Sequence, residues 1–213
     1  MAADVQKIIS ILSKTYPNAK IELNFRNTYE LFVAVVLSAQ CTDKLVNKVT
    51  PAVFAKLPTV YDMAAVDIGE LENMIYSTGF YKNKAKNLKA AAEVLVRDFN
   101  GKMPDTMSEL LKLPGVARKT ANVILNAGFG KNEGVVVDTH VCRLTGKLGL
   151  VPQKLSRTKN AVKIEGILMK KLPRNEWGHF SYLLVWHGRR ICIARKPKCT
   201  ICPLNEICPS AEM

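Results

Sequence analysis

The sequence lacks the features that would place it in a membrane or outside the cell. No apolar run approaches the roughly 18 residues that a membrane-spanning helix needs. The longest run, LFVAVVLSA at residues 31–39, is half that length. The N-terminal residues MAADVQKIIS contain an aspartate and no apolar signal-peptide core. We therefore expect no membrane contact and, from the compact length and the missing targeting segment, a prokaryotic cytoplasmic protein.

Strand patterns, internal repeats and low-complexity linkers are also missing. Residues 135–137 (VVV) form a short extended run at most. Apolar residues recur instead at spacings of three and four, which predicts helices at residues 43–57, 67–79, 82–99 and 156–172. Asp67 with Glu70 and Thr106 with Glu109 resemble capping boxes. We predict an all-α fold of about ten short helices, with a domain boundary in the Gly-rich segment 128–134.

Acidic residues are scarce relative to basic ones. The 213-residue chain has 31 Lys and Arg but 18 Asp and Glu, a net charge of +13. This excess favours a polyanionic partner, of which nucleic acid is the usual one. A basic surface that only confers solubility is the alternative. Because the basic residues are spread along the chain, any DNA-binding face must be formed by folding.

Four of the six cysteines lie in the last 22 residues, at Cys192, Cys199, Cys202 and Cys208. Inside a cell such a group favours metal or iron–sulfur ligation over disulfides. Four thiolates can hold zinc or a [4Fe–4S] cluster. Zinc ribbons usually have two C-x2-C pairs, and this tail has one. Cys41 and Cys142 lie outside the pattern, and we expect them to be buried thiols.

The stretch LPGVARKTAN at residues 113–122 predicts a helix, a Pro-Gly turn and a second helix over residues 117–127. Gly115 lets the backbone come close to a partner, and the unpaired N–H groups of a helix start can bind an anion. Lys119 falls in the first helical turn, where the helix dipole and the neighbouring Arg118 both disfavour a further positive charge. A neutral amine can form a Schiff base. The alternatives are an ordinary helix connection and a solvated or phosphate-binding lysine.

Asp138 lies 19 residues after Lys119, in the stretch VVVDTHVCR. Aspartate is a strong N-cap, and we expect it to cap a helix over residues 139–147. We interpret His140 as a hydrogen-bonded structural histidine.

Taken together, five segments resemble the endonuclease III branch of the helix-hairpin-helix DNA glycosylases. They are LSAQCTD (37–43), TGFYKNKAKNL (78–88), LPGVARKTAN (113–122), VDTHVCR (137–143) and the cysteine tail. The resemblance covers about residues 21–208. It implies two lobes with a cleft: a six-helix barrel at residues 22–131, and a second domain of residues 1–21 and 132–213 that holds a [4Fe–4S] cluster.

The resemblance also implies an activity and a partner. It implies a base excision repair enzyme that removes oxidised pyrimidines such as thymine glycol from double-stranded DNA. The same enzyme then cleaves the abasic site by β-elimination through a lysine Schiff base. We expect a monomer, associated with the nucleoid through its DNA.

The site residues follow from the same resemblance. Lys119 is the nucleophile, and Asp138 is the carboxylate that stabilises positive charge on the sugar. Gln40 fills the gap left by the flipped base, and Phe80 is an apolar wedge, although an ordinary loop hydrophobe is the alternative for Phe80. Phosphate contacts are expected from the hairpin and from basic side chains elsewhere in the chain: Pro114, Gly115, Val116, Ala117, Arg118, Lys82, Lys84, Arg195, Lys196 and Lys198.

Some assignments stay open at this stage. Asp43 either contacts the flipped base or, as we prefer, caps the helix beginning at Lys44. Ala117 stands where the family usually has glycine, and the spacing from Lys119 to Asp138 is one residue longer than usual. Other functions are also candidates. One is a mismatch adenine glycosylase, although such enzymes usually lack the lysine and carry a further C-terminal domain. A pyrimidine-dimer glycosylase and a non-catalytic iron–sulfur DNA-binding protein are also candidate functions.

Overall fold

The fold was derived from a computed structural model, which describes residues 3–211. Within this range the chain forms twelve α-helices and three short 3₁₀ helices, with no strand. The predicted all-α class is confirmed. Residues 135–137 belong to no helix or strand, and all three valines are buried. No helix in the described range has both the length and the apolar character needed to cross a membrane.

The chain divides into two compact units. We call residues 22–133 the central unit and residues 1–21 with 134–213 the terminal unit. The division falls at the end of the Gly-rich segment 128–134, two residues later than the boundary we predict from the sequence. The terminal unit therefore combines the two ends of the chain, while the central unit is one continuous segment.

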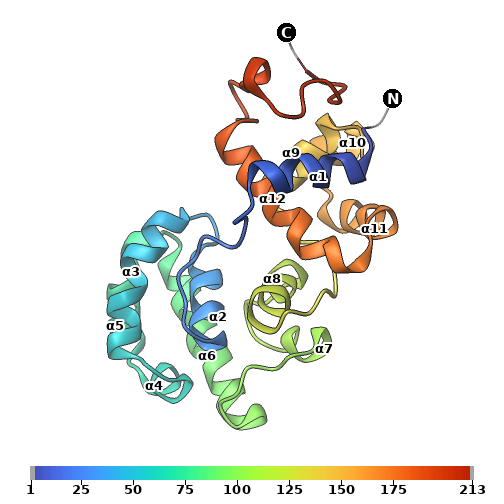
Figure 1. Cartoon of the computed structure of the whole chain (residues 1–213). Coiled ribbons are helices and arrows are strands. Elements are labelled where there is room, and N and C mark those ends of the chain that lie inside the picture. The colour runs from blue at the N-terminus through green and yellow to red at the C-terminus, as the bar shows by residue number, and fades with distance from the viewer. Residues whose placement is uncertain (1–2, 212–213) are drawn as a thin grey trace. The chain divides into compact units, whose positions relative to one another are not determined.

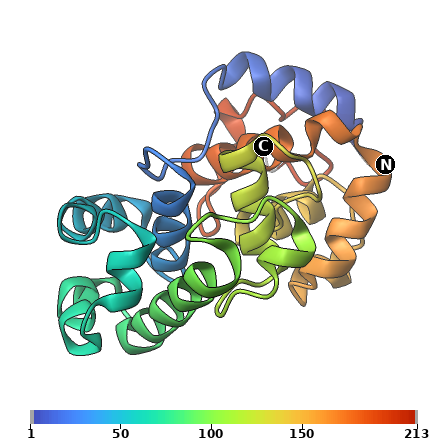
Figure 2. The same ribbon diagram turned by 90° about the horizontal axis from the view of Figure 1, so that it is seen from below.

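The central unit contains seven α-helices and one 3₁₀ helix (Figure 1). In chain order they are α2 (Thr28–Leu37), α3 (Asp43–Lys56), α4 (Val60–Ala65), α5 (Ile68–Ile75), η1 (Tyr76–Thr78), α6 (Tyr81–Phe99), α7 (Met107–Leu110) and α8 (Arg118–Phe129). The long helix α6, in green in Figure 2, packs against α2, α4 and α5. Helix α8 packs against α2 and α7.

Helix α2 forms the centre of this unit. Nine of its ten residues are buried, so the longest apolar run of the sequence is a core helix. The single acid among them, Glu30, is 2% exposed. Its carboxylate accepts hydrogen bonds from the Arg26 guanidinium at 2.6 Å and from the Arg26 backbone N–H at 2.7 Å. These bonds offset the free-energy cost of burying a charge.

Helix boundaries in the central unit follow local capping. Asp67 accepts a hydrogen bond from Glu70 N–H at 3.0 Å and Thr106 from Glu109 N–H at 3.4 Å, so both residues are N-caps as predicted. The reciprocal bond that completes a capping box occurs instead at Thr59 and Asp62. The prediction that Asp43 caps α3 is wrong. Thr42 is the N-cap and accepts from the N–H of Leu45, because the helix begins one residue earlier, at Asp43 itself.

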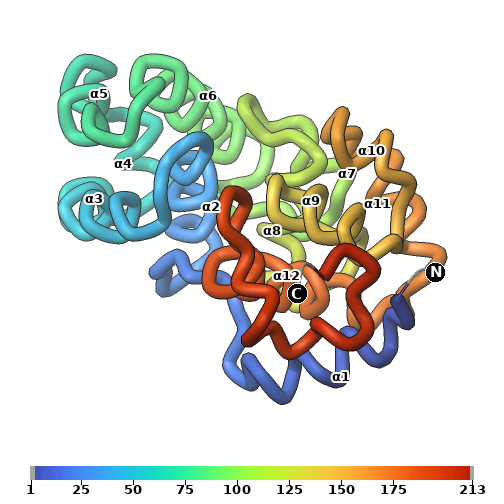
Figure 3. Tube along the Cα trace, turned by 90° about the horizontal axis from the view of Figure 1, so that it is seen from above, coloured from blue at the N-terminus to red at the C-terminus, as the bar shows by residue number. Residues whose placement is uncertain are grey.

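The terminal unit contains five α-helices and two 3₁₀ helices among its described residues. They are α1 (Val5–Thr15), α9 (Thr139–Lys147), α10 (Gln153–Arg157), α11 (Ala161–Lys171), η2 (Arg174–Glu176), α12 (Trp177–Arg190) and η3 (Cys199–Ile201). Apolar residues from α1, α9, α11 and α12 form one core, with Ile8, Leu12 and Phe180 fully buried. Figure 3 shows the tail, in red, leaving α12 in a series of loops.

The single helix predicted at residues 156–172 is wrong. The chain breaks between α10 and α11, where Lys159 adopts a left-handed conformation with φ of 51°. Asn160 then caps α11 by accepting from the N–H of Lys163. An asparagine N-cap starts a new helix here, which an apolar pattern alone does not reveal.

Candidate catalytic and DNA-binding site

The hairpin in the central unit is a tight turn fixed to α6. The carbonyl of Leu113 accepts from the N–H of Val116 at 3.1 Å, and Gly115 has φ of +78°. Proline and then a positive-φ glycine at the two inner positions fit a type II turn. A Cβ on Gly115 would meet Asn87 Cβ of α6 at 2.8 Å. Glycine is therefore required both for the backbone conformation and for this close approach.

Helix α8 begins directly after the turn and has no side-chain cap. The N-cap residue is Ala117, whose methyl group cannot accept a hydrogen bond. Arg118 and Lys119 are the first two helical residues, and both are exposed. The N-terminal N–H groups of α8 and two basic side chains thus lie at one exposed helix end, which suits an anion.

Ala117 fits its position without strain. Its φ of −91° and ψ of 169° are extended backbone that any residue adopts. The methyl group therefore does not restrict the hairpin's dihedral angles, and the difference from the family's usual glycine leaves the backbone shape intact.

The two residues expected to enter the DNA stack lie on separate loops of the central unit. Gln40 lies between α2 and α3, and Phe80 lies between η1 and α6. Both are exposed, Phe80 by 62%. Both also adopt left-handed backbone conformations, with φ of 53° and 50°. Non-glycine residues in this region are strained and cluster at functional sites.

The two lysines at the start of α6 differ in position. Lys82 is exposed in the first helical turn, where it can reach a phosphate. Lys84 is 4% exposed, and its Nζ donates to the carbonyls of Leu37 and Thr78, both at 2.8 Å. Burial lowers the pKa of Lys84. We therefore correct our prediction: a buried ammonium already bonded to two carbonyls is not a phosphate contact.

Asp138 lies in the terminal unit and caps α9. Its Oδ1 accepts from the N–H of Val141 at 2.8 Å, as we predict from the sequence. The capping bond fixes the carboxylate at the exposed end of the helix. His140 is half-buried and bonded to Arg143 Nη2 at 3.2 Å, and burial lowers its pKa. These contacts agree with a structural role for His140.

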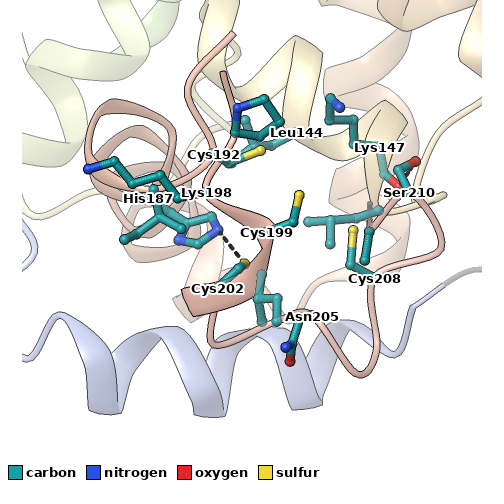
Figure 4. Close-up of a pocket in the computed structure, with 15 residues that line it drawn as sticks. Leu144, Lys147, His187, Cys192, Lys198, Cys199, Cys202, Asn205, Cys208 and Ser210 are labelled. Carbon is teal, nitrogen blue, oxygen red and sulfur yellow. Dashed lines mark hydrogen bonds between the residues drawn. The ribbon is translucent and has the colours of Figure 1, made fainter. Parts of the chain in front are cut away.

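The four tail cysteines face one pocket in the terminal unit. Figure 4 shows their sulfurs around a common space. Leu144, Leu148 and Leu204 also line this pocket. All four are free thiols. Over residues 3–211 no three metal-binding side chains come close enough to hold a single ion. Four thiols placed around a shared apolar space fit a cluster, which has a width of its own and takes thiolate ligands.

Three residues beside this pocket were not predicted. His187 places Nε2 3.5 Å from Cys202 Sγ, and its Nδ1 lies 3.1 Å from the Tyr16 hydroxyl. Arg143 Nη1 donates to the Cys192 carbonyl and lies 3.7 Å from Cys192 Sγ. Burial lowers the pKa of His187 to about 4. The signal in the sequence for His187 is its place in WHGRR (186–190), which ends two residues before Cys192. Tyr16 and Arg143 lie far from the tail along the chain, and no local pattern marks them.

Burial also affects the thiols. It raises the pKa of Cys192 and of Cys202, while the guanidinium of Arg143 acts on Cys192 in the opposite direction. Of the remaining cysteines, Cys142 is buried as expected and Cys41 is half-buried.

The segment between the first two tail cysteines forms a closed loop. The Lys198 N–H donates to the Ile191 carbonyl at 3.0 Å, which joins the two ends of the loop. We call this segment the basic tail loop, because it carries three exposed basic side chains: Arg195, Lys196 and Lys198.

Comparison with known proteins agrees with this arrangement. Residues 33–174 match the HhH-GPD superfamily of base excision DNA repair proteins. Residues 192–208 match the iron–sulfur binding domain of endonuclease III. The fold and the cysteine tail thus define an iron–sulfur member of the helix-hairpin-helix base excision repair proteins.

Individual relatives narrow this class. The chain is 48% identical to the endonuclease III of Synechocystis, over 97% of this chain and 92% of the relative. It is 43% identical to that of Bacillus subtilis, over 92% and 88% of the two chains. A solved non-covalent endonuclease III–DNA complex superposes with a TM-score of 0.91 at 42% identity, covering 97% of this chain and 94% of that one. The chain belongs to the endonuclease III family of DNA glycosylases and abasic-site lyases, and it has that family's [4Fe–4S] cluster motif.

The structure brings some predicted residues together and leaves others in separate units. The four cysteines share one pocket, and the hairpin lies against α6. Lys119 belongs to the central unit and Asp138 to the terminal unit. That both residues act on one nucleotide is therefore a proposal.

Proposed function

We propose that this protein removes oxidised pyrimidines of the thymine glycol type from duplex DNA and then cleaves the strand at the abasic site. The observation that carries this proposal is the exposed Lys119 in the first turn of α8, directly after a tight turn and an uncapped helix start. The helix start holds a phosphate of the damaged strand. Lys119 is thereby held beside the sugar of the damaged nucleotide.

The chemistry proceeds in two steps at this lysine. The neutral Lys119 amine attacks C1′ of the sugar, and the bond between C1′ and the base breaks as the base leaves with the bonding electrons and a proton. Opening of the sugar ring gives a Schiff base between C1′ and Nζ. Loss of a proton from C2′ then expels the 3′ phosphate, which is β-elimination. Hydrolysis of the Schiff base releases the enzyme.

Asp138 supports both steps. Positive charge develops on the sugar as the glycosidic bond breaks, and a nearby carboxylate stabilises it. The carboxylate also takes or returns protons around the amine. The capping bond at Val141 uses Oδ1 and holds the side chain in one orientation.

The remaining residues bind and open the duplex. Extruding a base from the stack costs a few kcal/mol, which Gln40 and Phe80 offset by filling the vacated space. In the hairpin, the exposed Gly115, Ala117 and Arg118 contact phosphates beside Pro114, as do Lys82 and the basic tail loop. Val116 is buried and its N–H is bonded to the Leu113 carbonyl, so we withdraw it as a phosphate contact. Cys192, Cys199, Cys202 and Cys208 hold the [4Fe–4S] cluster, whose role is to fix the shape of the basic tail loop. The enzyme acts as a monomer.

Borohydride trapping tests this proposal. Wild type, Lys119→Ala and Lys102→Ala are each mixed with a duplex that contains one thymine glycol, and with a duplex that contains a plain abasic site. Lys102 is another exposed lysine of the central unit and serves as the matched control. We expect a covalent protein–DNA adduct with wild type and Lys102→Ala and none with Lys119→Ala.

Different results would point to different functions. Base release without an adduct in wild type means a glycosylase without lyase activity and a different role for Lys119. An adduct with the abasic duplex but not with thymine glycol means another lesion, to be sought with pyrimidine-dimer and adenine-mismatch duplexes. Binding with neither release nor adduct means a non-catalytic DNA-binding protein.

A further inference from the structure

The loops that carry Gln40 and Phe80 share an unusual feature. We define the Gln40 loop as residues 38–42 and the Phe80 loop as residues 79–80. Each presents a left-handed, exposed residue, and Gly79 before Phe80 also has a positive φ, of 69°. Such conformations persist only where the surrounding structure holds them. Contacts elsewhere in the central unit must therefore hold these two loops.

Part of the support is local to each loop. In the Gln40 loop the N–H of Cys41 donates to the Ser38 carbonyl at 3.1 Å. In the Phe80 loop the Phe80 carbonyl accepts from the N–H of Lys84 at 3.1 Å. These bonds shape each loop, but they do not set the distance from one loop to the other.

The buried ammonium of Lys84 joins the bases of the two loops. Nζ donates at 2.8 Å to the carbonyl of Leu37, the last residue of α2, and at 2.8 Å to that of Thr78, the last residue of η1. Gln40 lies three residues after the first of these carbonyls, and Phe80 lies two residues after the second. One nitrogen therefore fixes both loops where they leave their helices.

Lys84 suits this task because it is inaccessible to water. With 4% of the residue exposed, its hydrogen bonds are not exchanged for bonds to solvent. Carbonyl oxygens at helix C-termini carry partial negative charge, which offsets the cost of burying the cation. The same burial makes Lys84 useless as a direct DNA contact.

We propose that Lys84 is a positioning residue that holds the Gln40 and Phe80 loops in register, so that both side chains enter the DNA stack together. This inference rests on the proposed roles of Gln40 and Phe80. A lysine that only stabilised the fold would affect every DNA-dependent step equally. A lysine that sets the spacing of the loops affects base extrusion above all.

Lys89 provides a matched control on the same helix. Its Nζ also donates to two carbonyls, those of Ala64 at 2.6 Å and Val66 at 2.8 Å, at the end of α4. Neither carbonyl belongs to a loop with a proposed DNA contact. Lys84→Met and Lys89→Met each remove an ammonium from two carbonyls and keep most of the aliphatic side chain, so a purely structural loss appears in both.

The decisive measurement does not depend on which lesion the enzyme excises. A duplex carries a non-cleavable abasic analogue with 2-aminopurine opposite, whose fluorescence reports stacking around the gap. At saturating cluster-loaded protein, we expect wild type and Lys89→Met to change this fluorescence equally, and Lys84→Met to give less than half of that change. Single-turnover excision of thymine glycol should fall about tenfold to a hundredfold in Lys84→Met. Its β-elimination at a plain abasic site should fall by no more than about twofold, because no base has to be extruded.

Three results overturn the inference, and they are distinguishable. A full fluorescence change with Lys84→Met, or equal losses in both methionine variants, reduces Lys84 to a structural residue while Gln40 and Phe80 keep their roles. If saturating wild type leaves the fluorescence unchanged, the proposed roles of Gln40 and Phe80 are wrong, and so is this inference. The role of Lys119 is tested separately by borohydride trapping. Thermal melting checks that each variant is folded. If Lys84→Met does not fold, Lys84→Gln takes its place, because its amide keeps two N–H donors. Its fluorescence change should lie between that of wild type and that expected for Lys84→Met.

Discussion

Replacing Gly115 with alanine tests whether the shape of the hairpin controls DNA binding. With φ of +78°, this position costs an L-residue about 1–2 kcal/mol. The new Cβ would also stand 2.8 Å from Asn87 Cβ, and overpacking of this kind adds about 1–3 kcal/mol. The Cβ of Asn87 is fixed to the backbone of α6 and cannot rotate away. The hairpin must therefore shift.

Gly130→Ala separates the two effects, because Gly130 lies at the other end of the same helix. Its φ is +65°, and nothing lies within 4 Å of an added Cβ. This variant has the backbone strain without the clash. At about 2–4 °C per kcal/mol, its melting midpoint should fall by about 2–8 °C, and that of Gly115→Ala should fall further.

Fluorescence anisotropy with a duplex that contains a non-cleavable abasic analogue measures the functional consequence. A hydrogen bond to a charged group contributes about 1.5–3 kcal/mol, so loss of one phosphate bond at the hairpin should raise Kd about 10- to 150-fold in Gly115→Ala. In Gly130→Ala we expect Kd to stay within about twofold of wild type. An unchanged Kd in Gly115→Ala would refute the reasoning. An equal loss in both variants would attribute the effect to general destabilisation.

Three further predictions concern other parts of the structure. Asp138→Asn keeps an N-cap acceptor for the N–H of Val141, so the melting midpoint should stay the same. The rate of single-turnover excision should fall about 10²- to 10⁴-fold. An unchanged rate would show that Asp138 takes no part in the chemistry. Alanine at all three basic positions of the basic tail loop should reduce the slope of log affinity against log salt by about 0.9 for each phosphate that the protein no longer neutralises, and an unchanged slope would show that the loop does not touch DNA. Burial raises the pKa of Tyr29, and raises that of Tyr182 to about 12, above the unfolded value of about 10. The stability that these protonated tyrosines contribute is complete below pH 10 and is lost as pH rises through their folded pKa values, so the melting midpoint should drop in that window and drop less in Tyr29→Phe.

Much of the fold was predictable because the signals are local. The apolar stripe of residues 82–99 predicted α6 within one residue, and Asp67 and Thr106 marked true helix starts. Caps and periodicity act over a few residues, so a single sequence contains them. The same locality explains the errors. Thr42 and Asp43 are both good caps, and only the completed helix shows which of them is used.

The position of Lys84 illustrates what local patterns leave out. It stands among Lys82, Asn83 and Lys86, in a segment that looks like a solvated helix face. The helical phase nevertheless places it one turn before Leu88, on the buried stripe, and that spacing is the signal that could have identified it. Its carbonyl partners, Leu37 and Thr78, lie 47 and 6 residues away. Contacts across such separations depend on tertiary packing and on no single motif.

The discontinuous terminal unit has a consequence for the order of folding. Helix α1 contributes the buried Ile8 and Leu12 to a core that also needs α12, and Tyr16 bonds to His187. At about 5–20 residues per second of synthesis, some 10 to 40 s pass between the emergence of these two helices. Synthesis of the central unit, residues 22–133, is complete well before then. Helix α1 is thus synthesised early and buried late, and its apolar face remains available to chaperones until α12 has been synthesised.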